Sequence, residues 1–311
     1  MNLTVNIGKL KLKNPVMTAS GTFGYGQEYS EFLDLSQLGA IVAKGISLKP
    51  MKGNPPPRIC ETPCGMLNAI GLQNVGLKVF VKEKLPFLKK TDTVIIANIL
   101  GNSIGEYVKL SGSLDNAGVD AIELNVSCPN VKKGGIIFGT DIKLLGRLIS
   151  KVRKSVKNAV LITKLSPNVS DIKAFARAAE DSGSDAVSLI NTIPGLSIDI
   201  NTRSPRIRNV TGGLSGPAIR PIAVRMVYEA ACAVKVPVIG MGGIMNAEDA
   251  LEFIIAGATA VAVGTANFIN PKVTIDILDG LREYMERKGI QDINSLRGSL
   301  NIERPDNNTH D

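Results

Sequence analysis

The sequence predicts an α/β protein built as one closed (β/α)8 barrel. Apolar runs of strand length recur eight times, and amphipathic helical stretches separate most of them. Several helical stretches end in a glycine turn that leads straight into the next strand, as in A-G-V-D-A-I, S-G-S-D-A-V and A-G-A-T-A-V. The length of 311 residues is one that such barrels commonly occupy as a single domain.

The predicted elements follow in order along the chain. An alternating polar and apolar segment around Gly8 predicts an N-terminal hairpin that plugs one end of the barrel. A helical stretch should link the first two strands, and the last helices should span about 271–300. The barrel domain is expected over 1–300 and a flexible tail over 301–311. The eight strands are expected at 15–19, 38–45, 93–100, 120–127, 159–166, 186–192, 236–242 and 260–265.

Two connections, 47–76 and 193–217, are unusually long for a compact domain. They follow the second and sixth strands, so both leave the carboxyl-terminal face of the barrel. Long ordered loops at this face typically act as lids or binding loops. We therefore expect both to lie over the site.

Composition excludes several functional classes. The formal charge of +8 comes from lysines and arginines that are spread over many segments, and aromatic residues make up 4% of the chain, so a stacking platform for nucleic acid is not expected. Cys60 and Cys64 lack the second pair or histidine of a zinc or iron–sulfur site, and no metal site is predicted. Cys232 is expected in the core. The single histidine, His310, lies in the tail, so acid–base chemistry must proceed without histidine.

The sequence shows neither a signal peptide nor an apolar run long enough to cross a membrane. Its four cysteines are isolated rather than arranged as a disulfide framework. These features predict a soluble protein of the reducing cytoplasm.

The segment L-N-V-S-C-P-N-V-K-K-G-G ends the fourth predicted strand and carries Cys128. The following Pro129 stiffens the turn, and Lys132 and Lys133 would favour a thiolate. Cys128 is therefore a candidate base or nucleophile. The alternative is that Cys128 is a small buried apolar residue, which is the more common role of a single cysteine.

Glycine turns follow the seventh and eighth strands, in G-M-G-G and V-G-T. In barrels these two turns commonly bind phosphate through backbone N–H groups, although ordinary tight turns have the same composition. The candidate donors are Gly242, Gly243, Gly264 and Thr265. No G-x-G-x-x-G motif follows a strand into a helix, so a mononucleotide fits better than a dinucleotide.

Lys44 and Lys164 end the second and fifth apolar strands, where an unpaired ammonium would be costly to bury. Together with a phosphate site they suggest an anionic substrate and a cofactor that gains negative charge, as a reduced flavin does. Side-chain amides offer both a donor and an acceptor, which suits a pyrimidine or isoalloxazine edge. Four lie at strand ends or in the first long connection: Asn68, Asn98, Asn125 and Asn191.

Taken together, these motifs resemble those of the dihydroorotate dehydrogenases over almost the whole chain. The matching strings are N-P-V-M-T-A-S-G-T-F-G-Y-G, A-K-G, P-R-I-C-E-T-P-C-G-M-L-N-A-I-G-L-Q-N, L-N-V-S-C-P-N-V-K-K-G-G, G-M-G-G and V-G-T. The resemblance implies an FMN-containing barrel that oxidises dihydroorotate to orotate in pyrimidine biosynthesis.

The resemblance also implies site residues. Cys128 would be the catalytic base that removes the C5 proton while the C6 hydride passes to FMN, and Asn130 would also reach the substrate. The implied substrate-binding residues are Lys44, Asn68, Ala69, Ile70, Gly71, Leu72, Asn125, Asn191 and Thr192. The implied FMN-binding residues are Ser20, Lys44, Gly45, Asn98, Asn125, Lys164, Ile190, Gly216, Gly242, Gly243, Gly264 and Thr265.

Within the family, K-K-G-G after C-P-N-V resembles the NAD-dependent class, 1B, in which this chain would be the catalytic subunit. Its implied partner is an electron-transfer subunit with FAD and an iron–sulfur cluster, in a heterotetramer of two of each. Quinone-dependent members resemble the chain less, because they use a serine base and an N-terminal membrane segment.

Three alternatives remain open. The chain could be a fumarate-dependent dihydroorotate dehydrogenase. It could be another FMN barrel that acts on a dihydropyrimidine or dihydrouridine. A basic barrel that binds nucleotides or RNA without catalysis is the non-enzymatic alternative, which salt-sensitive RNA binding would support.

Overall fold

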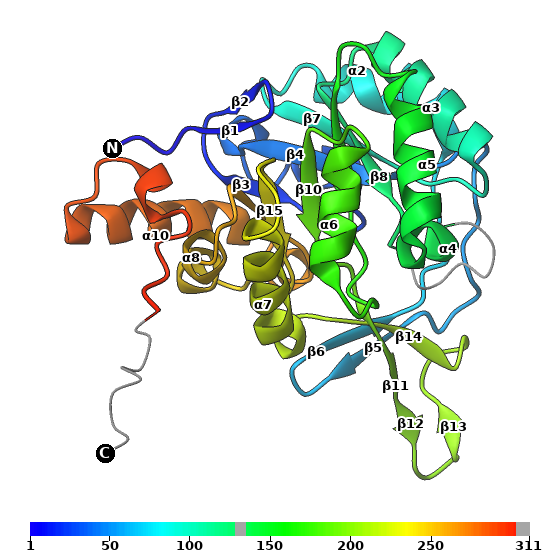
Figure 1. Cartoon of the computed structure of the whole chain (residues 1–311). Coiled ribbons are helices and arrows are strands. Elements are labelled where there is room, and N and C mark those ends of the chain that lie inside the picture. The colour runs from blue at the N-terminus through cyan, green and yellow to red at the C-terminus, as the bar shows by residue number, and fades with distance from the viewer. Residues whose placement is uncertain (128–134, 303–311) are drawn as a thin grey trace, which may run out of the picture.

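Eight parallel strands close into a barrel in the computed structural model, which describes residues 1–127 and 135–302 (Figure 1). Neighbouring strands follow the chain order around the barrel, which confirms the predicted (β/α)8, or TIM, architecture. The barrel strands are β3 (Val16–Thr18), β4 (Ala40–Ile46), β7 (Val94–Ile99), β8 (Ala121–Asn125), β9 (Val160–Lys164), β10 (Ala186–Leu189), β15 (Val238–Met241) and β16 (Ala260–Val263).

The barrel strands are apolar because both of their faces are buried. Helices cover the outer face, and the inner face points into the packed interior of the barrel. Every residue of β8 and β9 is buried, including the polar residues at their carboxyl ends. Asn125 pairs with Lys164, which in turn pairs with Ser188 on β10. Paired residues of parallel strands point to the same side, so this register gathers polar side chains at one mouth.

Helices follow seven of the eight strands, and a left-handed glycine ends several of them. Gly118, with φ 76°, is the C-cap of α3 (Ile104–Ala117) and turns the chain towards β8. The helices are α1 (Gly76–Val79), η3 (Phe80–Lys84, a π-helix) and α2 (Leu85–Leu88), which form one rod, followed by α3 (Ile104–Ala117), α4 (Gly135–Thr140), α5 (Ile142–Arg153), α6 (Ile172–Asp181), η4 (Pro217–Ile219), α7 (Arg220–Ala231), α8 (Ala247–Ile255), α9 (Ala266–Ile269), α10 (Val273–Lys288) and η5 (Ile293–Leu296).

The prediction of a helical stretch between the first two strands is wrong. Two 3₁₀ turns, η1 (Gln27–Tyr29) and η2 (Leu35–Gln37), occupy it. The Asp34 side chain accepts a hydrogen bond from the Ser36 N–H and starts a separate turn. Such local bonds compete with a continuous helix.

The N-terminal hairpin consists of β1 (Val5–Ile7) and β2 (Leu10–Leu12), as predicted. Its turn residue Gly8 lies against Asp185 and Val160, which mark the amino-terminal ends of β10 and β9. The hairpin therefore covers the end of the barrel opposite to the polar mouth.

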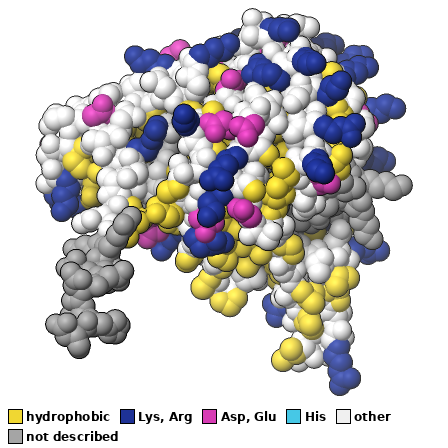
Figure 2. Space-filling view, viewed as in Figure 1, with side chains coloured by type: hydrophobic (Ala, Val, Ile, Leu, Met, Phe, Trp, Pro, Cys, Tyr) yellow, Lys and Arg dark blue, Asp and Glu magenta, His cyan; other side chains and the backbone are white. Residues whose placement is uncertain are grey.

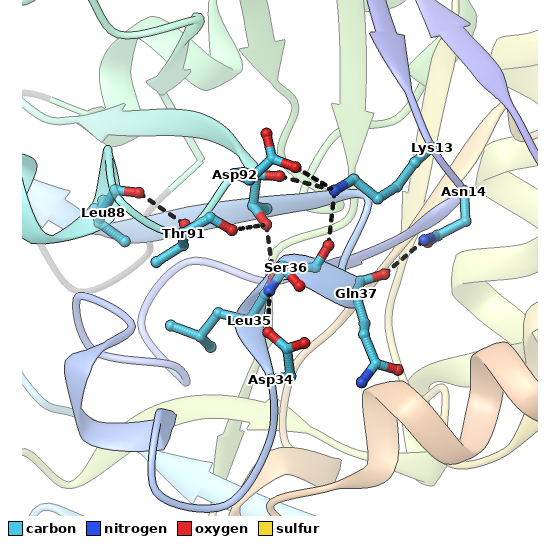
Figure 3. Close-up of polar contacts among 10 residues, drawn as sticks. Lys13, Asn14, Asp34, Leu35, Ser36, Gln37, Leu88, Thr91 and Asp92 are labelled. Atoms are coloured by element: carbon cyan, nitrogen blue, oxygen red, sulfur yellow. Dashed lines mark hydrogen bonds and ion pairs between the residues drawn. The ribbon is translucent and has the colours of Figure 1, made fainter.

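Lys13 follows the hairpin, and its hydrogen bonds hold the chain at the same end of the barrel (Figure 3). Its ammonium donates to the carbonyl oxygens of Ser36 and Asp92, each at 2.8 Å. The Thr93 hydroxyl donates to the Leu35 carbonyl oxygen at 2.6 Å. These bonds join the segments that enter β4 and β7, far from the chemistry expected at the other end.

The two long connections form a sheet rather than the loops that were predicted. Strands from both connections join in the order β11-β14-β6-β5, and a second pair extends as an arm (Figure 1). This pairing is non-local, so neither connection alone signals it. The strands are β5 (Ile59–Thr62), β6 (Gly65–Asn68), β11 (Ile193–Leu196), β12 (Ile198–Asp199), β13 (Ser204–Pro205) and β14 (Thr211–Ser215).

Cys232 is exposed, so its expected place in the core is wrong. The residue is the C-cap of α7, whose buried positions include Met226, Val227 and Ala230. A position two residues beyond Ala230 falls on the opposite side of a helix, which explains the exposure.

The charged surface is mixed on the face shown in Figure 2, where Lys and Arg side chains lie over several elements with Asp and Glu between them. None of the helices in the described ranges combines the length and apolar character that crossing a membrane requires. Among described residues no cluster of His, Cys, Asp or Glu is arranged to hold a metal ion. The predicted tail lies outside the described residues from position 303 onward, and its separation from a 1–300 domain stays a prediction.

Candidate active site at the carboxyl-terminal mouth

Hydrogen-bonded amides line the mouth where β7 and β8 end. Asn98 Nδ2 donates to Glu123 Oε2 at 2.5 Å, and Asn125 Nδ2 donates to Asn98 Oδ1 at 3.3 Å. The buried hydroxyl of Tyr107, on α3, donates to the backbone carbonyl oxygen of Asn125 at 2.8 Å. The end of β8 is therefore fixed through both its side chain and its backbone.

The same chain of hydrogen bonds continues to the end of β10. Asn125 Oδ1 accepts from the N–H and the hydroxyl of Ser127, at 3.4 and 3.2 Å. Ser127 Oγ accepts from Asn191 Nδ2 at 2.9 Å, and Asn191 Oδ1 accepts from the Thr192 N–H at 2.7 Å. Four residues predicted from the sequence, Asn98, Asn125, Asn191 and Thr192, thus form one connected group.

Lys164 is 5% exposed at the end of β9 and makes no hydrogen bond or ion pair with any described residue. A buried ammonium is costly unless an anion neutralises it. Its placement between the paired residues Asn125 and Ser188 directs it to the same mouth. The geometry therefore suits an anionic group bound there.

Lys44 is half-buried on β4, and its pKa is lowered from the ordinary lysine value. Burial is the largest cause, the nearby guanidinium of Arg58 adds to it, and Glu28 opposes it. The neighbouring Gly45 lies so close to Asn98 that a Cβ at position 45 would come within 3.1 Å of Asn98 Oδ1. Lys44 and Gly45 of the A-K-G motif thus both lie at the mouth.

The glycine turns predicted to bind phosphate gather in one place. A Cβ on Gly243 would lie 2.7 Å from the Gly216 carbonyl oxygen, and one on Gly242 would lie 3.3 Å from the Ile190 side chain. Gly242, Gly243 and Gly216 have φ values of 132°, 81° and 91°, which favour glycine.

The turn after β16 adjoins this glycine cluster. Thr265 Oγ1 donates to Ser215 Oγ at 2.8 Å, next to Gly216. A Cβ on Gly264 would lie 3.6 Å from Ala19, the residue before the half-buried Ser20. The residues predicted for the phosphate end therefore lie in adjoining turns, where Gly242, Gly243, Gly264 and Thr265 are half-buried and Gly216 is buried.

Asn68 and Thr192 meet through the sheet above the mouth. Asn68 Nδ2 donates to the Gly213 carbonyl oxygen at 3.2 Å. The Thr192 side chain packs on the same glycine, where a Cβ would lie only 2.0 Å from Thr192 Oγ1. The sheet thus carries Asn68 on β6 and packs against Thr192, which directly precedes β11.

The segment after Asn68 is held in an unusual conformation. Asn54 donates from its side chain to the Ala69 carbonyl oxygen and from its backbone to that of Ile70, each at 2.9 Å. Gly71 and Leu72 both have positive φ values, 75° and 58°. Left-handed backbone is costly for leucine, so the surrounding bonds must hold this segment in place.

Cys128 and Asn130 lie outside the described residues, so their predicted roles stay predictions. Two surface cavities, one between α8, α9 and α10 and one between α5 and α6, are lined by none of the predicted site residues. Sequence reasoning missed Glu123, Ser188 and Ser215. Glu123 had a signal, because it is a charged residue inside the apolar run A-I-E-L-N.

Comparisons with known proteins agree on one family. A family model described as "Dihydroorotate dehydrogenase" matches residues 2–285. A relative from Thermoanaerobacter sp. (strain X514), named "Dihydroorotate dehydrogenase B (NAD(+)), catalytic subunit", is 59% identical over 97% of this chain and 100% of its own length. Proteins of the same name from Lachnoclostridium phytofermentans and Thermodesulfovibrio yellowstonii are each 58% identical over 96% of this chain and over 100% and 98% of their own lengths. The chain therefore belongs to the dihydroorotate dehydrogenase family.

Proposed function

We propose that this chain is an FMN-dependent catalytic subunit that oxidises dihydroorotate to orotate in pyrimidine biosynthesis. The observation that carries the proposal is the end-to-end similarity to relatives named dihydroorotate dehydrogenase B (NAD(+)), catalytic subunit. The polar mouth supports it independently, because amides and lysines suit a small planar anion with carbonyl and N–H edges.

The residues present fit FMN. Gly216, Gly242 and Gly243 have positive φ values and leave no room for a Cβ, so only glycine fits these three turns, and N–H groups of such glycine turns suit a phosphate. The buried Lys164 ammonium, which has no counter-charge among described residues, suits the electron-accepting ring. When bound, FMN accepts the hydride that leaves C6 of dihydroorotate.

The chain's own residues would act on the substrate. The Cys128 thiolate takes the C5 proton, which the neighbouring carbonyl acidifies, and the C5–C6 double bond of orotate forms as the hydride departs. Lys44 holds the substrate carboxylate, while Asn68, Asn125, Asn191 and Thr192 hold the ring. Ala69, Ile70, Gly71 and Leu72 also hold the substrate.

We further propose that electrons pass to NAD through an electron-transfer subunit with FAD and an iron–sulfur cluster, in a cytoplasmic heterotetramer of two of each. The words "NAD(+)" and "catalytic subunit" in the names of the relatives support this assignment. Co-expression with candidate electron-transfer subunits, followed by NAD reduction assays with dihydroorotate, tests it. Reoxidation of this chain alone by fumarate would favour the fumarate-dependent class.

The function is tested by adding dihydroorotate to the purified yellow protein without oxygen. Loss of the visible absorption of oxidised flavin, with orotate as the product, is the expected result. Persistent yellow colour with dihydroorotate, together with bleaching by a dihydropyrimidine or dihydrouridine, would reject the proposal in favour of a related flavin enzyme.

Cys128→Ala should retain FMN but slow flavin reduction by about 10²- to 10⁴-fold, the usual contribution of a positioned base. Rapid-mixing absorbance measurements give the rate. The matched control is Cys232→Ala, which removes an exposed thiol on α7 and should leave the rate unchanged. Equal rates in the wild type and Cys128→Ala would remove Cys128 from the mechanism.

A further inference from the structure

Glu123 is a buried carboxylate that the proposed reaction does not use. It is 2% exposed on β8 and forms no ion pair with any described residue. Its Oε2 accepts from Asn98 Nδ2 at 2.5 Å, and its Oε1 accepts from Ser188 Oγ at 2.7 Å. The carboxylate therefore joins β7 and β10 to β8 through the barrel interior.

The Glu123 carboxylate fixes which way the Asn98 amide faces. Glu123 Oε2 is the acceptor in this hydrogen bond, so Asn98 turns its NH₂ group towards it. The side-chain carbonyl oxygen of Asn98 then faces Asn125, and Asn125 donates to it from its own NH₂ group. Glu123 in this way determines the orientation of the Asn98 amide and, through it, the orientation of the Asn125 amide.

The other end of the chain of hydrogen bonds agrees with this direction. Backbone N–H groups only donate, and the Thr192 N–H donates to Asn191 Oδ1. The amide of Asn191 therefore turns its NH₂ group to Ser127. With an acceptor at the Glu123 end and a donor-only N–H at the Thr192 end, one direction satisfies every group along this chain of hydrogen bonds.

This direction determines what Asn125 can offer a ligand. Asn125 Oδ1 already accepts from both the N–H and the hydroxyl of Ser127, which occupies its two lone pairs. One of its two N–H groups binds Asn98, so the remaining group is an N–H donor. A ring bound against Asn125 must therefore present an acceptor, such as a carbonyl oxygen.

We propose that Glu123 is a positioning residue that sets the direction of the hydrogen bonds from Asn98 to Thr192 and so makes Asn125 a donor to a carbonyl oxygen of the substrate. The ligand part of this proposal rests on the proposed function. Glu123 itself need not touch substrate or cofactor, since it acts through Asn98.

Four variants separate this role from a charge or packing role. Glu123→Gln keeps an acceptor for Asn98 and can donate to the Ser188 hydroxyl, which rotates to accept. Glu123→Met keeps the size but removes the acceptor. Asn98→Asp places two carboxylates together, and Asn98→Asp combined with Glu123→Gln restores a donor facing an acceptor while Asn125 still meets an oxygen.

Orotate dissociation constants of the FMN-loaded proteins, read from the flavin spectrum, give the main result. Orotate binding should weaken by about tenfold or more in Glu123→Met and Asn98→Asp, the usual effect of an unpaired buried polar group. Glu123→Gln should stay within about threefold of the wild type, and adding it to Asn98→Asp should recover most of the loss.

Three outcomes would overturn the proposal. If Glu123→Gln weakened orotate binding as much as Glu123→Met, the charge would matter rather than the direction. If Glu123→Met lowered only the melting temperature, the residue would have a packing role. Should Glu123→Met fail to fold, absence of recovery in the paired Asn98 and Glu123 variant would decide against the proposal.

Melting temperatures of the FMN-free proteins test the hydrogen-bond direction without any ligand. Asn98→Asp should melt below the wild type, and the paired variant should melt above Asn98→Asp. A wild-type protein that binds no orotate would refute the proposed function. The recovery of melting temperature would still support or overturn the role of Glu123 in that case.

Discussion

Lys164 is the residue whose environment most clearly demands a ligand. Its ammonium is buried and unpaired within the described ranges, which makes the empty protein less stable than an apolar residue would. Lys164→Met should therefore leave the FMN-free protein equally or more stable, while FMN binding weakens by at least about tenfold.

Thermal unfolding without FMN and fluorescence titration with FMN measure the two effects of Lys164→Met. The matched control is Lys143→Met, which removes an exposed ammonium on α5 and should change neither value. A fall in the stability of the FMN-free protein with unchanged FMN affinity would contradict this role.

Lys44 gives the site a dependence on pH. Its pKa in the folded protein lies below the ordinary lysine value, so the ammonium is lost earlier as the pH rises. Orotate affinity should fall as the pH rises through this lowered pKa, before an ordinary lysine near ~10.4 would deprotonate. The unfolded chain binds more protons in that window, so the ligand-free protein should gain stability there.

Orotate titrations at increasing pH test the role of Lys44, in a Cys128→Ala background that removes the titration of that thiol. Lys44→Arg, which stays charged, should flatten the alkaline fall in affinity. An unchanged profile in Lys44→Arg would show that another group titrates.

At the scale of elements, Asp115 connects α3 to the start of β9. Its carboxylate accepts from the N–H groups of Lys157, Asn158 and Ala159, at 3.0, 2.9 and 2.7 Å. Burial raises the pKa of this carboxyl, but the three backbone N–H groups together lower it more, and the net pKa lies below the ordinary value. Asp115 thereby fixes the strand that carries Lys164.

Asp115→Asn should lower the free energy of unfolding at neutral pH by about 1–3 kcal/mol, because a donor replaces an acceptor among three N–H groups. A lowered pKa stabilises the fold above the unfolded value near ~3.9, and this contribution is lost as the pH falls through the folded pKa. The difference between variant and wild type should therefore shrink in acid. Denaturant unfolding measures it, with the exposed Asp181→Asn as control.

The elements differed in how well local sequence specified them. The strands and most helices were predicted because each has its own apolar pattern and glycine C-cap, as at Gly118. The stretch before β4 was mispredicted because the Asp34 side chain and the nearby glycines favour separate turns. Local polar bonds of this kind outweigh a weak helical pattern.

At the scale of the whole molecule, the sheet that joins the two long connections adjoins the candidate site through Asn68 and Thr192. Gly213 lies at its centre, bonded to Asn68 and packed beneath Thr192. Gly213→Ala should destabilise the protein by about 1–3 kcal/mol through overpacking and weaken orotate binding by displacing Thr192.

The matched control for Gly213→Ala is Gly195→Ala in the same sheet. A Cβ there would lie 2.9 Å from Leu67 Cδ2 and 3.7 Å from Leu214 Cβ, so it would be crowded by one apolar side chain and would not touch Thr192. Denaturant unfolding and orotate titration of both variants test the prediction. Equal behaviour of the two would show that the contact with Thr192 does not control the site.

The sequence by itself determined the barrel, its N-terminal hairpin, the candidate site residues and the family resemblance, because buried strands, glycine turns and short motifs are local patterns. The tertiary structure alone decided that the two long connections pair as one sheet and that Glu123 faces Asn98 and Ser188. The reason is physical: strand pairing between distant segments and hydrogen bonds across a barrel depend on partners that no local pattern identifies. A buried carboxylate therefore shows its role only when the groups that donate to it are in place.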